Sequence, residues 1–241
     1  MFPIIRLGPA SIQAPGLIIL IGIWIGLTLA EKRAEIIGFS KNQIDNLVII
    51  GGVVGILGAR LAFIVQYPTA FSGSLVSYFS LDFATLDLWG GVSALFLVFL
   101  IYINHHKINA WKVLDALTPL FSVLAFFIHF SHFASGKAFG VPTNLPWGMM
   151  LWGTERHPTQ IYNMVLALLI FLFIWKNQVA FSSIPGKTFL YFVFLSSSAA
   201  IITTTFLAES PMILGKIHLV QIVSFGIMLV VVSLLRKRQP I

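Results

Sequence analysis

Residues that could do chemistry gather in one polar stretch, His129–Tyr162, of an otherwise apolar chain. Within it His129 and His132 stand three positions apart, so they share one face if the segment is helical. A neutral imidazole there could act as a general base or shuttle a proton, and the two rings could equally be ordinary interfacial side chains. No carboxylate or cysteine directly accompanies the pair, so we expect no metal and no other cofactor.

The residues that follow the histidines could bind an anion. Gly136 and Gly140 would let backbone N–H groups approach a ligand closely, and Lys137 lies between them. Further along, Pro158 suits the first turn of a helix whose N-terminal amides attract anions, and Arg156 stands just before it. A plain loop between two membrane spans would have a similar composition. We favour a binding site.

A third candidate, Arg60, lies inside an apolar run far from this stretch. A charged side chain at membrane depth costs about 2.5–3.5 kcal/mol on insertion scales, so it normally faces a partner or a wet cavity. The partner could be Asp87 or a phosphate, which suits the guanidinium fork. We predict that Arg60 shares a polar cavity with the His129–Gly140 segment and binds an anionic lipid headgroup.

The composition determines which kind of protein must position these residues. Hydrophobic residues make up 58% of the 241, charged residues only 10%, and the mean hydropathy is +0.94. These values indicate one polytopic helical membrane domain over residues 1–241. The net charge of +7 lies at the ends of apolar runs, so we expect no nucleic-acid partner. Cysteine is absent, which excludes disulfides and thiolate chemistry.

Seven apolar runs of roughly bilayer length predict an all-α fold of seven transmembrane helices. They cover about Gly16–Ala30, Leu47–Gln66, Asp87–Asn104, Trp111–Phe133, Thr159–Trp175, Thr188–Leu207 and Leu219–Leu235. We take the first run as a span because the N-terminus lacks the features of a signal peptide. Close helix packing is predicted from the small residues of the second span, Gly51, Gly52, Gly55 and Gly58. The aromatic-rich connection Thr69–Leu86 is expected to lie on the membrane surface.

The distribution of lysine and arginine predicts the orientation, because basic residues concentrate on the cytoplasmic side. Alternate ends of the spans carry Lys32, Arg33, Lys41, Lys107, Lys112, Lys176, Lys187, Arg236, Lys237 and Arg238. The opposite ends carry only Arg6, Lys137, Arg156 and Lys216. The N-terminus is therefore predicted outside and the C-terminus in the cytoplasm, with the His129–Tyr162 stretch facing outward.

Short motifs along nearly the whole chain point to a known family. They are Phe2-Pro3-Ile4-Ile5 with Leu7-Gly8-Pro9, Gly58-Ala59-Arg60-Leu61 with Tyr67, Trp89-Gly90-Gly91, Leu145-Pro146-Trp147-Gly148, Arg156-His157-Pro158-Thr159-Gln160-Ile161-Tyr162, and Leu219-Val220-Gln221. Together they resemble the prolipoprotein diacylglyceryl transferase family. The resemblance implies a seven-span enzyme of the bacterial plasma (inner) membrane. Such an enzyme transfers the diacylglyceryl group of phosphatidylglycerol to the lipobox cysteine of a prolipoprotein at the outer leaflet.

The resemblance also suggests roles for individual residues. His129, His132 and Lys137 occupy catalytic positions. The residues expected to contact substrate are Arg60, Trp89, Gly136, Gly140, Arg156, Gln160 and Tyr162.

Several positions depart from the family's pattern. The family signature runs roughly Arg-Ile-Gly-Asn-Phe-x-Asn-Gly-Glu, and its ionisable and amide positions are replaced here. The replacements are His129, His132, Ser135 and Lys137, while Phe133, Gly136 and Gly140 are kept. The sixth span has Ile201 and Thr205 where the family carries an arginine and a glutamate, and Asn163 stands where a glutamate usually follows the tyrosine.

Three hypotheses follow. The first is a divergent transferase in which His129, His132 and Lys137 replace the usual groups. The second is a catalytically silent homologue that binds lipid or serves as a subunit of a larger membrane complex. The third, a transporter or channel, is less favoured, because Arg60 is the only ionisable residue predicted well inside a span, apart from Asp115 near the end of one.

Overall fold

Seven helices long and apolar enough to cross a membrane make up most of the structure, a computed structural model that describes residues 4–7, 10–71, 85–213, 215 and 217–238. Their bounds are α1 Ala14–Ile36, α2 Lys41–Gln66, α3 Leu88–His105, α4 Ala110–Ser135, α5 Thr159–Phe181, α6 Lys187–Thr204 and α7 Leu219–Arg236. The prediction of seven spans is confirmed, and the chain is a multi-pass membrane protein. The surface segment expected over Thr69–Leu86 lies mostly on residues 72–84, outside the described residues.

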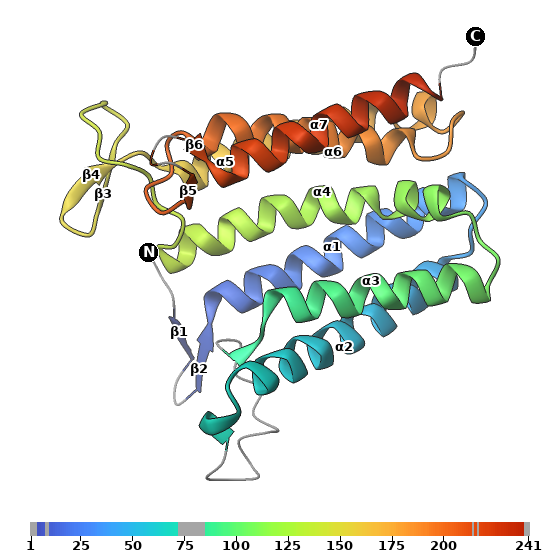
Figure 1. The fold of residues 1–241 in the computed structure, drawn as a ribbon, viewed down its shortest axis with the longest axis horizontal. Helices are drawn as coiled ribbons and strands as arrows, with labels where there is room; N and C mark the ends of the chain where they lie inside the picture. The colour runs from blue at the N-terminus through green and yellow to red at the C-terminus, as the bar shows by residue number, and fades with distance from the viewer. Residues whose placement is uncertain (1–3, 8–9, 72–84, 214, 216, 239–241) are drawn as a thin grey trace. The chain divides into compact units, whose positions relative to one another are not determined.

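Three short antiparallel hairpins accompany the helices, and each directly precedes a span (Figure 1). Their strands are β1 Ile4–Leu7 and β2 Ala10–Gln13 before α1, β3 Met149–Leu151 and β4 Thr154–Arg156 before α5, and β5 Met212–Ile213 and β6 Ile217–His218 before α7. The sequence analysis did not predict them, because strands of two to four residues show no usable alternation.

The helices divide into two compact units, residues 1–33 with 114–241 and residues 34–113, and each is described by itself. The expectation of a single domain stays a prediction. In the first unit α5, α6 and α7 lie side by side (Figure 1). In the second, α2 packs on α3 so closely that a Cβ added to Gly58 would stand 2.3 Å from the Cβ of Ala94. The predicted role of small residues in helix packing is therefore confirmed at Gly58.

The first helix is longer than predicted. The sequence placed the end of the first span near Ala30, but α1 continues to Ile36 and includes Arg33, which is 0% exposed. The sequence analysis places Arg33 among the basic residues at the ends of the spans. The structure instead buries its side chain, with Nη2 donating to Oγ1 of Thr188 at 3.2 Å.

Candidate functional site

The two histidines lie on the last turns of α4 and line a common cavity in the first unit. Their ring centroids are 6.0 Å apart, as expected for neighbours on one helix face. The cavity measures about 300 Å³ and lies among α4, α5 and α6. Its other polar side chains are Asn163, Ser196, Thr203 and Thr204. The structure thus places both imidazoles at a cavity, and their predicted catalytic role stays a prediction.

His132, which lines this cavity, has a ring nitrogen without a partner in the described part of the chain. Its Nδ1 is buried and has no hydrogen-bond partner among the described residues. Buried polar atoms are nearly always hydrogen-bonded in native proteins, so an exception calls for an explanation. Depending on the tautomer, this nitrogen can accept or donate a hydrogen bond.

The helix that carries the histidines ends in a defined cap. Gly136 adopts a left-handed conformation with φ of 74°, and its N–H donates to the carbonyl of Phe133 at 3.4 Å. The N–H of Lys137 donates to the carbonyl of His132 at 3.0 Å, which completes a Schellman motif. Both N–H groups thus serve the cap. The predicted substrate contact of Gly136 and the predicted catalytic role of Lys137 stay predictions, and the Lys137 side chain is exposed.

Two buried side chains at the start of α5 hold the turn after this cap. Nε2 of Gln160 donates to the carbonyl of Lys137 at 2.8 Å, and Oγ1 of Thr159 donates to that of Ala138 at 2.6 Å. Ala138 lines the cavity, so these bonds fix part of its wall. The structure gives Gln160 a positioning role, while its predicted contact with substrate stays a prediction.

Gly140 is required by a close backbone crossing. Its N–H donates to the carbonyl of His157 at 3.2 Å, and an added Cβ would stand 2.4 Å from that same oxygen. The next residue, Val141, donates to the carbonyl of Phe206 at 2.9 Å. The loop between α4 and α5 is thereby joined both to the residues before α5 and to the end of α6.

Arg156 braces this crossing through its guanidinium group. Nε donates to the carbonyl of Leu151 and Nη1 to that of Gly140, both at 3.3 Å. The guanidinium carbon also lies 4.9 Å from the ring centroid of Phe139, within cation–π range. These contacts give Arg156 a structural role in the loop, and its predicted contact with substrate stays a prediction.

A second cavity of about 470 Å³ has an aromatic wall that contains His157, a residue left out of the predicted substrate contacts. Nε1 of Trp147 donates to the hydroxyl of Tyr162 at 2.9 Å, and this hydroxyl lies 3.2 Å from Nδ1 of His157. The indole can only donate, so the hydroxyl accepts from Trp147, and its own proton is free to be donated to Nδ1 of His157 in the tautomer that leaves this nitrogen unprotonated. The two cavities share Leu166 and Thr203 as lining residues. His157 directly follows Arg156 in the same family motif, and this position could have identified it from the sequence.

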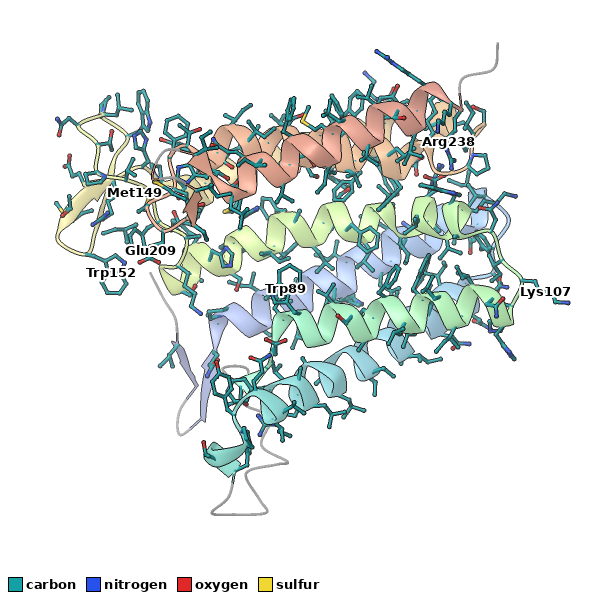
Figure 2. All side chains as sticks on the ribbon, in the orientation of Figure 1. Trp89, Lys107, Met149, Trp152, Glu209 and Arg238 are labelled. Carbon is teal, nitrogen blue, oxygen red and sulfur yellow. The ribbon has the colours of Figure 1, made fainter. Side chains whose placement is uncertain are left out.

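The remaining predicted residues belong to the second unit. Arg60 is buried; its Nη1 donates to the hydroxyl of Thr85 and, at 3.2 Å, to the carbonyl of that residue. Its guanidinium carbon stands 5.1 Å from the ring centroid of Phe71. Asp87 caps α3, with Oδ1 accepting from the N–H of Gly90 at 2.6 Å. Trp89, at the start of α3, is exposed (Figure 2). The cavity predicted between Arg60 and the His129–Gly140 segment stays a prediction.

A second buried polar cluster lies at the other end of α4 and was missed by the sequence analysis. Asp115 accepts from the N–H of Gly186 at 2.6 Å through Oδ2 and from that of Phe189 at 2.9 Å through Oδ1. It thereby caps the N-terminus of α6, and it interacts electrostatically with Arg33. The pairing joins residues far apart in the chain, so no local pattern shows it.

Comparisons with known proteins identify the family. The family model for prolipoprotein diacylglyceryl transferase matches residues 3–236. Three relatives named phosphatidylglycerol–prolipoprotein diacylglyceryl transferase are 28% identical over 211 residues (Prochlorococcus marinus strain NATL1A), 25% over 231 (Finegoldia magna) and 30% over 180 (Nitratidesulfovibrio vulgaris). These matches cover 76%, 94% and 71% of this chain and 70%, 92% and 67% of the relatives. The chain therefore belongs to the prolipoprotein diacylglyceryl transferase family, as its motifs predicted.

Proposed function

We propose that this protein transfers the diacylglyceryl group of phosphatidylglycerol to the thiol of a prolipoprotein cysteine at the outer leaflet of the bacterial plasma membrane. Family membership supports the reaction and both substrates. We place the reaction in the cavity of the first unit, because His129 and His132 both line it. A thiol must lose its proton as its sulfur attacks the glyceryl carbon, and an imidazole is suited to take up this proton.

The proposed step moves one proton and exchanges one bond. The thiol gives its proton to an imidazole nitrogen, and Nδ1 of His132 is the proposed acceptor because it is buried without a partner among the described residues. The sulfur then attacks the glyceryl carbon that bears the phosphate. The carbon–oxygen bond breaks, and the phosphoglycerol group leaves with the electron pair. A thioether between the cysteine and the diacylglyceryl group results.

The leaving group carries negative charge, which a nearby cation would stabilise. Among the described residues that line the two cavities there is no lysine or arginine. Lys137 is the proposed cation in this unit, because it directly precedes Ala138 of the cavity wall and its side chain is exposed. Arg60 and Trp89 of the second unit are kept as proposed lipid contacts.

Transfer can be tested with the purified protein in phosphatidylglycerol nanodiscs. A synthetic prolipoprotein peptide that contains the acceptor cysteine should gain the mass of a diacylglyceryl group. The double variant His129→Ala with His132→Ala should abolish this gain. A matched control, His105→Ala with His106→Ala at the end of α3, removes two histidines outside both cavities and should keep it. No transfer by the wild type, under conditions where a relative works, would contradict the proposal.

A catalytically silent homologue, which binds lipid or serves as a subunit of a larger membrane complex, is the second candidate. It is favoured by the sixth span, where Ile201 and Thr205 replace the family's charged pair. Nε2 of Gln221 donates to the carbonyl of Ile201 at 3.1 Å and to Oγ1 of Thr205 at 3.0 Å, so an amide occupies this region. Native mass spectrometry separates the candidates, because a silent homologue retains phosphatidylglycerol and forms no thioether.

The proposed reaction requires the His129–Tyr162 stretch to face the outside. We therefore keep the orientation with the N-terminus outside and the C-terminus in the cytoplasm. The chain has no cysteine, so single cysteines at positions 137 and 237 can be labelled selectively in intact cells. An impermeant reagent should reach only position 137. Labelling of both from the same side would reverse the topology.

A further inference from the structure

The β3–β4 hairpin lies at the edge of a small sheet in the first unit. Val141 to Thr143 pair with β4: the N–H of His157 donates to the carbonyl of Val141 at 3.1 Å, and that of Thr143 to the carbonyl of Glu155 at 3.0 Å. β4 pairs on its other side with β3. Within the described part of this unit, no further segment pairs with the outer side of β3. β3 is therefore an open edge strand.

The register shows which backbone groups that edge presents. Leu151 and Thr154 face each other across the two-residue turn Trp152–Gly153, and Met149 faces Arg156. In an antiparallel hairpin with such a turn these pairs exchange hydrogen bonds, and the residue between them turns its N–H and C=O the other way. That residue is Met150. Its two backbone groups point away from β4, and proteins normally protect such an edge.

The turn places a tryptophan where a small residue is expected. Trp152 and Gly153 both have positive φ, 53° and 76°, as in the hairpin turn that favours Asn-Gly. A left-handed conformation costs a residue other than glycine about 1–2 kcal/mol. The Trp152 side chain is 70% exposed, so packing within the described protein offsets little of this cost. Strain of this kind gathers at functional sites.

The side chains around this edge have the composition of a binding surface. Trp147 is 57% exposed and Met150 68%, and interfaces are enriched in tryptophan and methionine. Figure 2 shows Met149 and Trp152 on a hairpin that extends beyond the helix ends of its unit. Trp147 also lines the aromatic cavity, so the surface is continuous with the candidate site.

We propose that the outer edge of β3 is the docking strand for the acceptor polypeptide, which binds in an extended conformation with Trp152 against its side chains. This rests on the proposed transferase function. An extended peptide supplies the backbone N–H and C=O groups that the open edge lacks, as in strand addition to other sheets. Lipid chains supply neither, and open sheet edges are not found exposed to hydrocarbon. Because Trp147 lines the aromatic cavity, a peptide bound along β3 would lie near that cavity, which its acceptor thiol could then reach.

Two substitutions test the proposal without chemistry. The probe is a fluorescent prolipoprotein peptide in which serine replaces the acceptor cysteine, titrated with the full-length protein in nanodiscs. Met150→Pro removes the outward N–H at a position where an edge strand tolerates proline. Trp152→Asn removes the aromatic contact and restores the residue that the turn favours. Each should weaken peptide binding about tenfold or more, the loss typical of an interface hot spot.

Stability and matched controls separate docking from a structural role. Met150→Leu keeps the outward backbone groups and an apolar side chain of similar size, so it should lose far less affinity than Met150→Pro does. Trp152→Asn should leave the unfolding temperature equal or higher, because it relieves strain. A Trp152→Asn variant that loses stability and keeps peptide affinity would overturn the proposal. So would wild-type affinity in both variants, or no measurable binding by the wild type.

Two further outcomes are distinguishable. If the wild type binds the peptide through β3 yet transfers nothing to the cysteine form, docking stands and the transferase function falls. If transfer occurs and neither substitution affects binding, docking falls alone. A spin label at Trp152→Cys tests a membrane contact. Broadening by a water-soluble nickel complex supports docking from the aqueous side, and preferential broadening by oxygen dissolved in the bilayer would refute it.

Discussion

Two polar clusters on α4 differ in what satisfies them. Asp115, at the start of the helix, is bonded to two backbone N–H groups of another span. His129 and His132, about 21–26 Å further along the helix, face a cavity, and one of their nitrogens has no partner among the described residues. A buried polar side chain in this bundle is thus not evidence of function in itself. The comparison suggests that partners within the protein indicate assembly, and a cavity indicates a ligand.

The largest expected effect is a loss of stability on substitution of Asp115, whose described partners all lie within the protein. Asp115→Ala should destabilise the protein by about 3–5 kcal/mol, because it removes the cap of α6 and leaves the buried Arg33 without its countercharge. Thermal unfolding in detergent measures this loss. Asp115→Asn keeps an acceptor oxygen and should cost less. If Asp115→Ala unfolds at the wild-type temperature, the cluster does not hold the spans together.

Gly140→Ala should cost about 1–3 kcal/mol, since the new methyl group is forced against the His157 carbonyl. Its unfolding temperature should fall, and transfer should fall with it because the cavity wall shifts. Gly226→Ala in α7 is a matched control, since an added Cβ there meets nothing within 4 Å among the described residues. Equal unfolding temperatures for the two variants would show that the crossing at Gly140 can relax.

His132→Leu should raise the stability of the protein, whereas Asp115→Ala should lower it. Replacing a partly unsatisfied polar group by an apolar one of similar size should raise stability by about 1 kcal/mol. Transfer should be lost if the imidazole is the base. The peptide transfer assay and thermal unfolding, performed on the same preparation, give both quantities. A variant that keeps activity would remove His132 from the chemistry and weaken the comparison.

Arg60 tests the rule that a polar side chain with partners inside the protein serves assembly. Its described contacts are with protein, yet we propose that it also binds lipid. Arg60→Leu should weaken phosphatidylglycerol binding several-fold while insertion and yield stay intact, since one charge-assisted contact is lost. Native mass spectrometry of retained lipid measures this. Arg60→Lys, which keeps the charge but not the fork, should lie between the two. Unchanged lipid retention in Arg60→Leu would place Arg60 with the structural cluster.

The helices could be predicted from the sequence because bilayer length and hydropathy constrain them directly. The predicted ends differ most where charges continue the helix, as after Ala30 of α1. The three hairpins could not be predicted, because strands this short depend on pairing partners that only the fold supplies. The same limit applied to Arg33, whose burial requires Asp115 and Thr188 from distant segments.

The candidate site was predictable at the level of its imidazoles and not at the level of its supports. The spacing of His129 and His132 gave one shared face, and both line a cavity. Arg156 and Gln160 were expected to contact substrate, and the structure shows them bonded to the carbonyls of Leu151, Gly140 and Lys137. The carbonyl groups that bond to a long polar side chain are determined by the three-dimensional path of the loop. They cannot be inferred from composition.

The cap that α4 supplies to α6 has a consequence for biosynthesis. Because α4 is made before α6, the carboxylate of Asp115 is already within the nascent bundle when the N–H groups of Gly186 and Phe189 leave the ribosome. The start of α6 therefore meets a ready acceptor as it enters the bilayer. A chain that ends after α5 lacks the N–H groups of Gly186 and Phe189, so the carboxylate of Asp115 has neither of these partners until α6 is made.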